Sequence, residues 1–119
     1  LLDEDDRAEI EPADPSEIEV RPGEADTNYD LLNDARIDAG LEPLAWSDPL
    51  AAVALSHAEE MYLEGYVSHV SPTTGTVGDR VRAAGIRLVV VGENLALAAS
   101  PRAVHAGFME SEGHRENVL

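Results

Sequence analysis

The sequence predicts a mostly helical fold with one extended segment. Apolar residues recur with a helical period in several stretches that are bounded by capping residues and glycines. Only residues 86–94, IRLVVVGEN, form a β-branched run. Because a lone strand is not a stable sheet, the chain is either an irregular helical bundle or an α+β fold whose remaining strands follow Leu119. We favour the α+β fold, since the sequence stops abruptly at Leu119.

The first two predicted helices have clear boundary signals. Thr27 and Asp30 are spaced as a capping box, and a run of helical periodicity then leads to Gly40, which is suited to a helix stop. The second helix is expected to begin at Asp48, a capping residue that is followed by a proline suited to the first turn. It should end at Gly65.

The second half of the chain alternates loops with shorter helices. Residues 66–76 are rich in turn formers and predict a loop. A short helix should follow and end at Gly85. A last helix should open at Ser100, reach about Ser111 and be stopped by Gly113.

The N-terminal part of the chain differs in composition from the rest. Residues 1–26 contain three prolines, few apolar residues and a strong excess of acids. Such a segment cannot bury enough apolar surface to offset its ordering entropy. We therefore interpret residues 1–26 as an acidic linker or stalk and residues 27–119 as a domain. The alternative is an edge strand at SEIEV, where Ile18 and Val20 alternate with acids.

Charge and cysteine usage exclude several classes of function. The formal net charge is -16, and all eight basic residues are arginines. The chain therefore lacks the basic face that nucleic acids or anionic membranes require, and the charge fits a halophilic source. The absence of cysteine excludes disulfides and thiolate metal sites. No apolar run approaches the roughly 20 residues of a membrane span, and the chain reads as a piece of a longer polypeptide.

Three residues are candidates for a binding site. Of the four histidines, His57 and His105 lie in predicted helices and fit packing or solvated roles, whereas His69 and His114 lie in predicted loops. Glu93 closes an apolar run, where an acid is costly unless it is paired or bound to a metal. Two imidazoles and a carboxylate can hold a divalent cation with open positions, although no local metal motif such as HExxH is present.

Four short motifs, taken together, carry a family resemblance. They are NDAR at 33–36, SH at 68–69, GEN at 92–94 and GHRENVL at 113–119. In this order the chain resembles the prokaryotic branch of the CAP superfamily, which is named after cysteine-rich secretory proteins, antigen 5 and pathogenesis-related proteins. The resemblance covers residues 28–119, and the module is also called the SCP domain.

The resemblance implies an α-β-α sandwich whose C-terminal sheet strands are missing here, so that the domain is truncated at its C-terminal end. It also implies a central cleft lined by two histidines and two acids. His69, Glu93 and His114 match three of these positions. Ser111 stands where relatives have the second acid, and Phe108 stands where they commonly have tryptophan. We expect His69, Glu93, Ser111 and His114 to line the cleft, with the two histidines and Glu93 as metal ligands.

The resemblance implies a secreted or cell-surface binding module. Its expected ligand is a divalent cation, Zn²⁺ first, or a small apolar, lipid-like or cell-surface component. No residue is assigned a catalytic role. One alternative is a metal-dependent hydrolase that uses Glu93 as a general base, although the chain has no GxSxG motif. The other is a structural or adhesive surface domain with a vestigial cleft.

Overall fold

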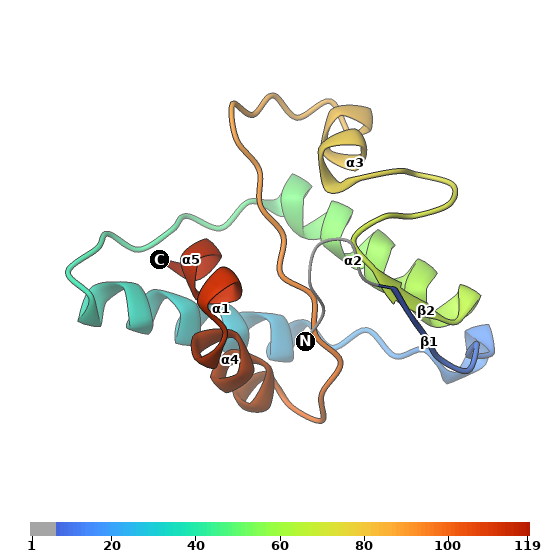
Figure 1. Ribbon diagram of the computed structural model, residues 1–119, viewed down its shortest axis with the longest axis horizontal. Helices are drawn as coiled ribbons and strands as arrows, with labels where there is room; N and C mark the ends of the chain where they lie inside the picture. The colour runs from blue at the N-terminus through green and yellow to red at the C-terminus, as the bar shows by residue number, and fades with distance from the viewer. Residues whose placement is uncertain (1–6) are drawn as a thin grey trace. The chain divides into compact units, whose positions relative to one another are not determined.

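A computed structural model of the protein describes residues 7–119, which form two compact units. Unit 1 consists of Val20–Trp46 and Ala96–Leu119, and unit 2 consists of the described residues up to Glu19 together with Ser47–Leu95. Figure 1 labels the helices and strands of both units. Each unit is described by itself below.

Unit 1 is built from three helices, α1 (Pro22–Asp38), α4 (Pro101–Glu110) and α5 (Glu112–Val118). They pack against one another, and Phe108 and Val118 are buried in the unit. Helix α1 begins five residues before the predicted cap at Thr27. The Thr27 hydroxyl instead donates to the Gly23 carbonyl inside the helix, because Pro22 already provides a favourable first turn.

Polar side chains of α1 fix the connector that follows it. Asn33 is buried, accepts from the Leu44 backbone N–H at 2.7 Å and donates to the Leu44 carbonyl at 3.1 Å. Arg36 donates to the Glu42 carbonyl at 2.8 Å and to the Val118 carbonyl at 2.9 Å. Arg36 therefore ties α1 both to its own connector and to the end of α5.

Helix α4 begins as predicted and ends at Glu110, next to the predicted end at about Ser111. The Ser100 hydroxyl accepts from the Ala103 N–H at 3.2 Å, as expected of a capping serine. Gly113 does not stop the helix. Ser111 adopts extended dihedral angles (φ -100°, ψ 122°) that break it, and Gly113 lies inside α5. His114 is consequently helical and buried, where the sequence predicted a loop.

Unit 2 centres on α2 (Asp48–Glu64), whose predicted range is confirmed. Its cap is Ser47, one residue before the expected Asp48, because the Ser47 hydroxyl accepts from the Leu50 N–H. Gly65 ends the helix with φ +78°, a conformation that favours glycine.

A two-stranded antiparallel sheet joins the N-terminal segment to the residues after α2. Strand β1 (Arg7–Glu9) pairs with β2 (Tyr66–Ser68), so that Ala8 lies opposite Val67. Residues 66–68 were predicted as a loop, which is wrong, since β1 supplies the pairing partner. The SEIEV alternative is also wrong as a strand, because Pro15–Glu17 forms the 3₁₀ helix η1. Residues 1–6 of the expected linker lie outside the described residues, and the division at residue 26 stays a prediction.

Helix α3 (Val77–Ala83) is held at its start by a capping box. The Thr76 N–H donates to Asp79 at 3.0 Å, and the Asp79 N–H donates to the Thr76 hydroxyl at 3.2 Å. The backbone hydrogen bond from Thr76, with help from Arg82, keeps the pKa of Asp79 below its ordinary value.

The segment that follows α3 is not a strand. Residues 86–95 have no strand partner within the described part of the chain, so the predicted β-branched strand does not form. The side chains of Val89 and Val90 are exposed. With helices and one small sheet, the fold class is nevertheless α+β, as predicted. Across residues 7–119, the helices are all too short or too polar to cross a membrane.

Candidate functional site

In unit 2 the structure brings together His69 and Glu93, two of the predicted site residues. His69 directly follows β2, and Glu93 lies in the irregular segment 86–95. The ring nitrogen Nδ1 of His69 lies 2.8 Å from Oε1 of Glu93, and each side chain is only 13% exposed. Nε2 of His69 has no hydrogen-bond partner among the described residues and is not sealed from solvent.

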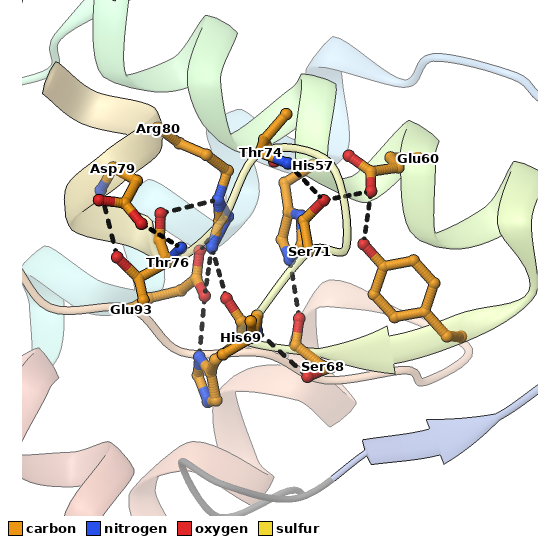
Figure 2. Close-up of polar contacts among 12 residues, drawn as sticks. His57, Glu60, Ser68, His69, Ser71, Thr74, Thr76, Asp79, Arg80 and Glu93 are labelled. Carbon is orange, nitrogen blue, oxygen red and sulfur yellow. Dashed lines mark hydrogen bonds and ion pairs between the residues drawn. The ribbon is translucent and has the colours of Figure 1, made fainter. Parts of the chain in front are cut away.

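Arg80 completes this group, and sequence reasoning missed it. Its guanidinium donates to both carboxylate oxygens of Glu93, at 3.2 and 3.3 Å, and to the His69 carbonyl at 2.8 Å. Figure 2 shows Arg80 reaching from α3 to both residues. One signal could have revealed it: Val77, Arg80 and Val81 are spaced as the inner stripe of a helix, so Arg80 occupies a position expected for an apolar residue.

The arrangement assigns a role to each ring nitrogen of His69. An ionised carboxylate only accepts hydrogen bonds, so Nδ1 carries the proton that points to Glu93. In the neutral imidazole Nε2 then has the lone pair, which can accept a hydrogen bond or bind a metal ion. Both oxygens of Glu93 already accept hydrogen bonds, which favours an orienting role for this carboxylate over proton abstraction.

In unit 1 the structure brings together Ser111 and His114. Oγ of Ser111 lies 2.7 Å from Nδ1 of His114. The ring of His114 stacks on Phe108, with 5.5 Å between ring centroids and 11° between ring planes. Ser111 thus fixes the second candidate imidazole through the same nitrogen that Glu93 engages in His69.

The predicted site residues therefore form two pairs in two different units. His69 and Glu93 lie in unit 2, and Ser111 and His114 lie in unit 1. Among the described residues of either unit, no group of three or more histidines and acids gathers as ready-made metal ligands. The convergence of the two pairs in one cleft stays a prediction.

A second polar network of unit 2 surrounds Glu60 of α2. Its carboxylate accepts from Tyr66 at 2.7 Å, from Ser71 at 2.5 Å and from Thr73 at 3.3 Å. Burial by itself raises the pKa of Glu60, but these hydrogen bonds outweigh burial and lower the pKa below its ordinary value. The network anchors the turn just after His69 to α2, as Figure 2 shows.

His57 is buried, as the sequence predicts, and only 2% of it is exposed. Its Nε2 donates to the Ser68 carbonyl at 2.8 Å, and its Nδ1 has no partner within the described residues. His57 and Arg80 also line a cavity of about 480 Å³ along one face of α2. The Ser68 contact lies one residue before His69, so His57 supports the backbone at the candidate site.

The comparison with protein families decides the identity of the domain. A model described as the cysteine-rich secretory protein family, CAP, matches residues 29–119. This chain belongs to that family. The predicted family is therefore confirmed, and the match begins close to the expected domain boundary.

Two CAP relatives are proteins of Bacillus subtilis (strain 168). The chain is 40% identical over 92 residues to the "Uncharacterized membrane protein YlbC", covering 76% of this chain and 26% of that protein. It is 36% identical over 91 residues to the "Uncharacterized protein YkwD", covering 76% of this chain and 35% of that protein. The chain thus spans about a quarter to a third of the length of these relatives.

A solved structure supports the CAP fold. The chain resembles the 1.5 Å crystal structure of an extracellular protein containing a SCP domain from Bacillus anthracis str. Ames, with a TM-score of 0.81 and 36% identity. The likeness covers 92% of this chain and 37% of the other. The structural likeness covers more of this chain than the 76% that each sequence relative covers. It therefore includes residues before position 29, where the family match begins.

Proposed function

We propose that this CAP domain is an extracellular or cell-surface binding module whose recognition atom is Nε2 of His69. The observation that carries the proposal is the 2.8 Å contact between Nδ1 of His69 and Glu93. It fixes the ring and the tautomer and directs the lone pair of the neutral imidazole to Nε2. The extracellular SCP protein of Bacillus anthracis supports the location, while one relative is named a membrane protein.

The ligand that we propose first is a divalent cation, with Zn²⁺ preferred. Imidazole nitrogen suits Zn²⁺, and metal-binding histidines almost always donate their other ring N–H to a carboxylate or carbonyl. His69 and Glu93 fit that pattern. In this proposal His69 contacts the metal ion, and Glu93 contacts His69. The assignment of His114 as a further metal ligand stays a prediction from the sequence.

A hydrolase with Glu93 as its general base is less well supported. The carboxylate of Glu93 already accepts from both His69 and Arg80, so a water molecule would have to displace one of these donors. A small apolar or lipid-like ligand stays a further prediction for the same module. The exposed side chains of Val89 and Val90, which shortly precede Glu93, would form an apolar rim for such a ligand.

The proposal is tested by titrating the protein with ZnCl₂ while following its thermal unfolding. A ligand that binds the native state raises stability by about 2.7 kcal/mol at 100 times its dissociation constant. We expect the wild type to respond, and we expect His69→Ala to lose the response. His105→Ala is the matched control, because it removes a partly exposed imidazole of α4 outside both residue pairs. A wild type that does not respond, or a full response in His69→Ala, would refute the cation site.

A further inference from the structure

Arg80 binds both halves of the His69–Glu93 pair at the same time. It lies in α3, and only 6% of its side chain is exposed. One terminal nitrogen, Nη2, donates both to the His69 carbonyl and to Oε1 of Glu93, while Nη1 donates to Oε2. Nε additionally lies 3.4 Å from the Thr76 carbonyl, at the capped start of α3. One rigid guanidinium therefore fixes the position of the Glu93 carboxylate relative to the backbone of His69.

Glu93 needs such an anchor more than a carboxylate on a helix would. It lies in residues 86–95, which form neither helix nor strand, and it is 24 residues away from His69 in the sequence. Neither helical backbone hydrogen bonds nor strand pairing fixes its carboxylate. The buried positive charge of Arg80 does so, because a fork of charge-assisted hydrogen bonds fixes both the position and the plane of a carboxylate.

We propose that Arg80 is a positioning residue that selects the Nδ1–H tautomer of His69 by holding the Glu93 carboxylate against Nδ1. The ligand class follows from this tautomer. Nε2 then accepts from a hydrogen-bond donor or binds an imidazole-preferring cation such as Zn²⁺. Arg80 neutralises Glu93 and donates to both of its oxygens. The carboxylate therefore stays at Nδ1 of His69 and does not bind the ligand at Nε2. Cations that prefer several oxygen ligands, such as Ca²⁺ and Mg²⁺, find few at this site.

The ligand-class part of this inference rests on the proposed function, whereas the tautomer part does not. A purely structural Arg80 would stabilise the fold without setting the protonated nitrogen of His69. Arg82 offers a matched control on the same helix. It pairs with Asp79 at 2.6 Å, but its side chain is 71% exposed and makes no contact with His69 or Glu93 in the described residues.

The test is ¹⁵N NMR of the imidazole rings in the wild type, Arg80→Gln and Arg82→Gln, with circular dichroism as the check on folding. Spectra are taken at about pH 8, above the ordinary histidine pKa of about 6.5. We expect the Nδ1–H tautomer of His69 in the wild type and in Arg82→Gln, and a mixture of tautomers in Arg80→Gln. The Zn²⁺ dissociation constant should rise about 10- to 100-fold in Arg80→Gln, the usual effect of losing an outer-shell partner. It should stay unchanged in Arg82→Gln.

Arg80→Lys keeps the test decisive if Arg80→Gln does not fold. Lysine retains the charge, but its single ammonium cannot reproduce the fork across Glu93 and the His69 carbonyl. We therefore expect mixed tautomers in Arg80→Lys as well. A folded Arg80 variant that keeps the wild-type tautomer would overturn the inference. If the tautomer responds to Arg80 while Zn²⁺ leaves the wild type unchanged, the cation proposal fails and the positioning role stands.

Discussion

Replacing Gly65 by alanine should break the attachment of the N-terminal segment to α2. Gly65 has φ +78°, and a Cβ atom there would lie 2.7 Å from the Ile10 carbonyl oxygen and 2.7 Å from Cγ of Pro12. The left-handed conformation alone costs alanine about 1–2 kcal/mol. The clash should also remove two backbone hydrogen bonds. The Ile10 N–H donates to the Gly65 carbonyl at 2.9 Å, and the Ala13 N–H donates to the Tyr62 carbonyl at 2.8 Å. At about 1 kcal/mol each, they bring the expected loss to roughly 3–4 kcal/mol.

Gly85→Ala separates the conformational cost of alanine at a left-handed position from the cost of the steric clash. Gly85 has φ +76°, lies in the same unit and has no atom within 4 Å of an added Cβ, so its substitution should cost only the conformational part, about 1–2 kcal/mol. Urea unfolding followed by circular dichroism measures both losses. Deleting residues 1–13 removes the clashing atoms, so Gly65→Ala should then cost no more than Gly85→Ala. Equal losses in the full chain, or a larger Gly65→Ala loss that survives the deletion, would refute this reasoning.

Two further substitutions test the polar networks of the units. Asn33→Ala should destabilise the protein by about 1–3 kcal/mol in urea unfolding, because it leaves the Leu44 N–H without its acceptor, whereas the Leu44 carbonyl keeps a hydrogen bond from the Tyr29 hydroxyl; a loss below about 0.5 kcal/mol would contradict it. Glu60 has a lowered pKa, so its carboxylate stabilises the fold above the unfolded-state value of about 4.3, and this contribution disappears as the pH falls through the folded-state pKa. Glu60→Gln should therefore be less stable at neutral pH and lose less stability than the wild type between about pH 5 and pH 3.

The sequence predicted the elements whose ends carry local signals. Gly65 and Gly85 end their helices where glycine was expected, and Ser100 caps α4. Two local signals were misassigned, since α1 begins before Thr27 and Gly113 lies inside α5. The other errors arose where distant partners decide the structure. Residues 7–9 and 66–68 become strands only through each other, and residues 86–95 lack a partner among the described residues. Local sequence cannot show pairing between segments that are nearly 60 residues apart.

The residue types of the candidate site could be predicted from the sequence, but the hydrogen bonds between them could not. The family motifs pointed to His69 and Glu93, and the structure joins them through Nδ1. Arg80 escaped notice because its importance depends on the packing of α3 against α2 and on the path of an irregular segment. The roles of His69, Glu93 and His114 as metal ligands and of Ser111 as a residue of the cleft stay predictions, as do the halophilic source and the identity of the ligand.

The assembly of unit 1 has a consequence for the order of events during synthesis. Arg36 of α1 holds the Val118 carbonyl across 82 positions of the sequence, and all of Ser47–Leu95 lies between the two parts of the unit. While a ribosome is still producing that intervening stretch, α1 has no α4 or α5 to pack against. The surface of α1 that packs against α4 and α5 in the complete unit is then accessible to chaperones, and premature termination before α4 would leave this helix accessible to proteases.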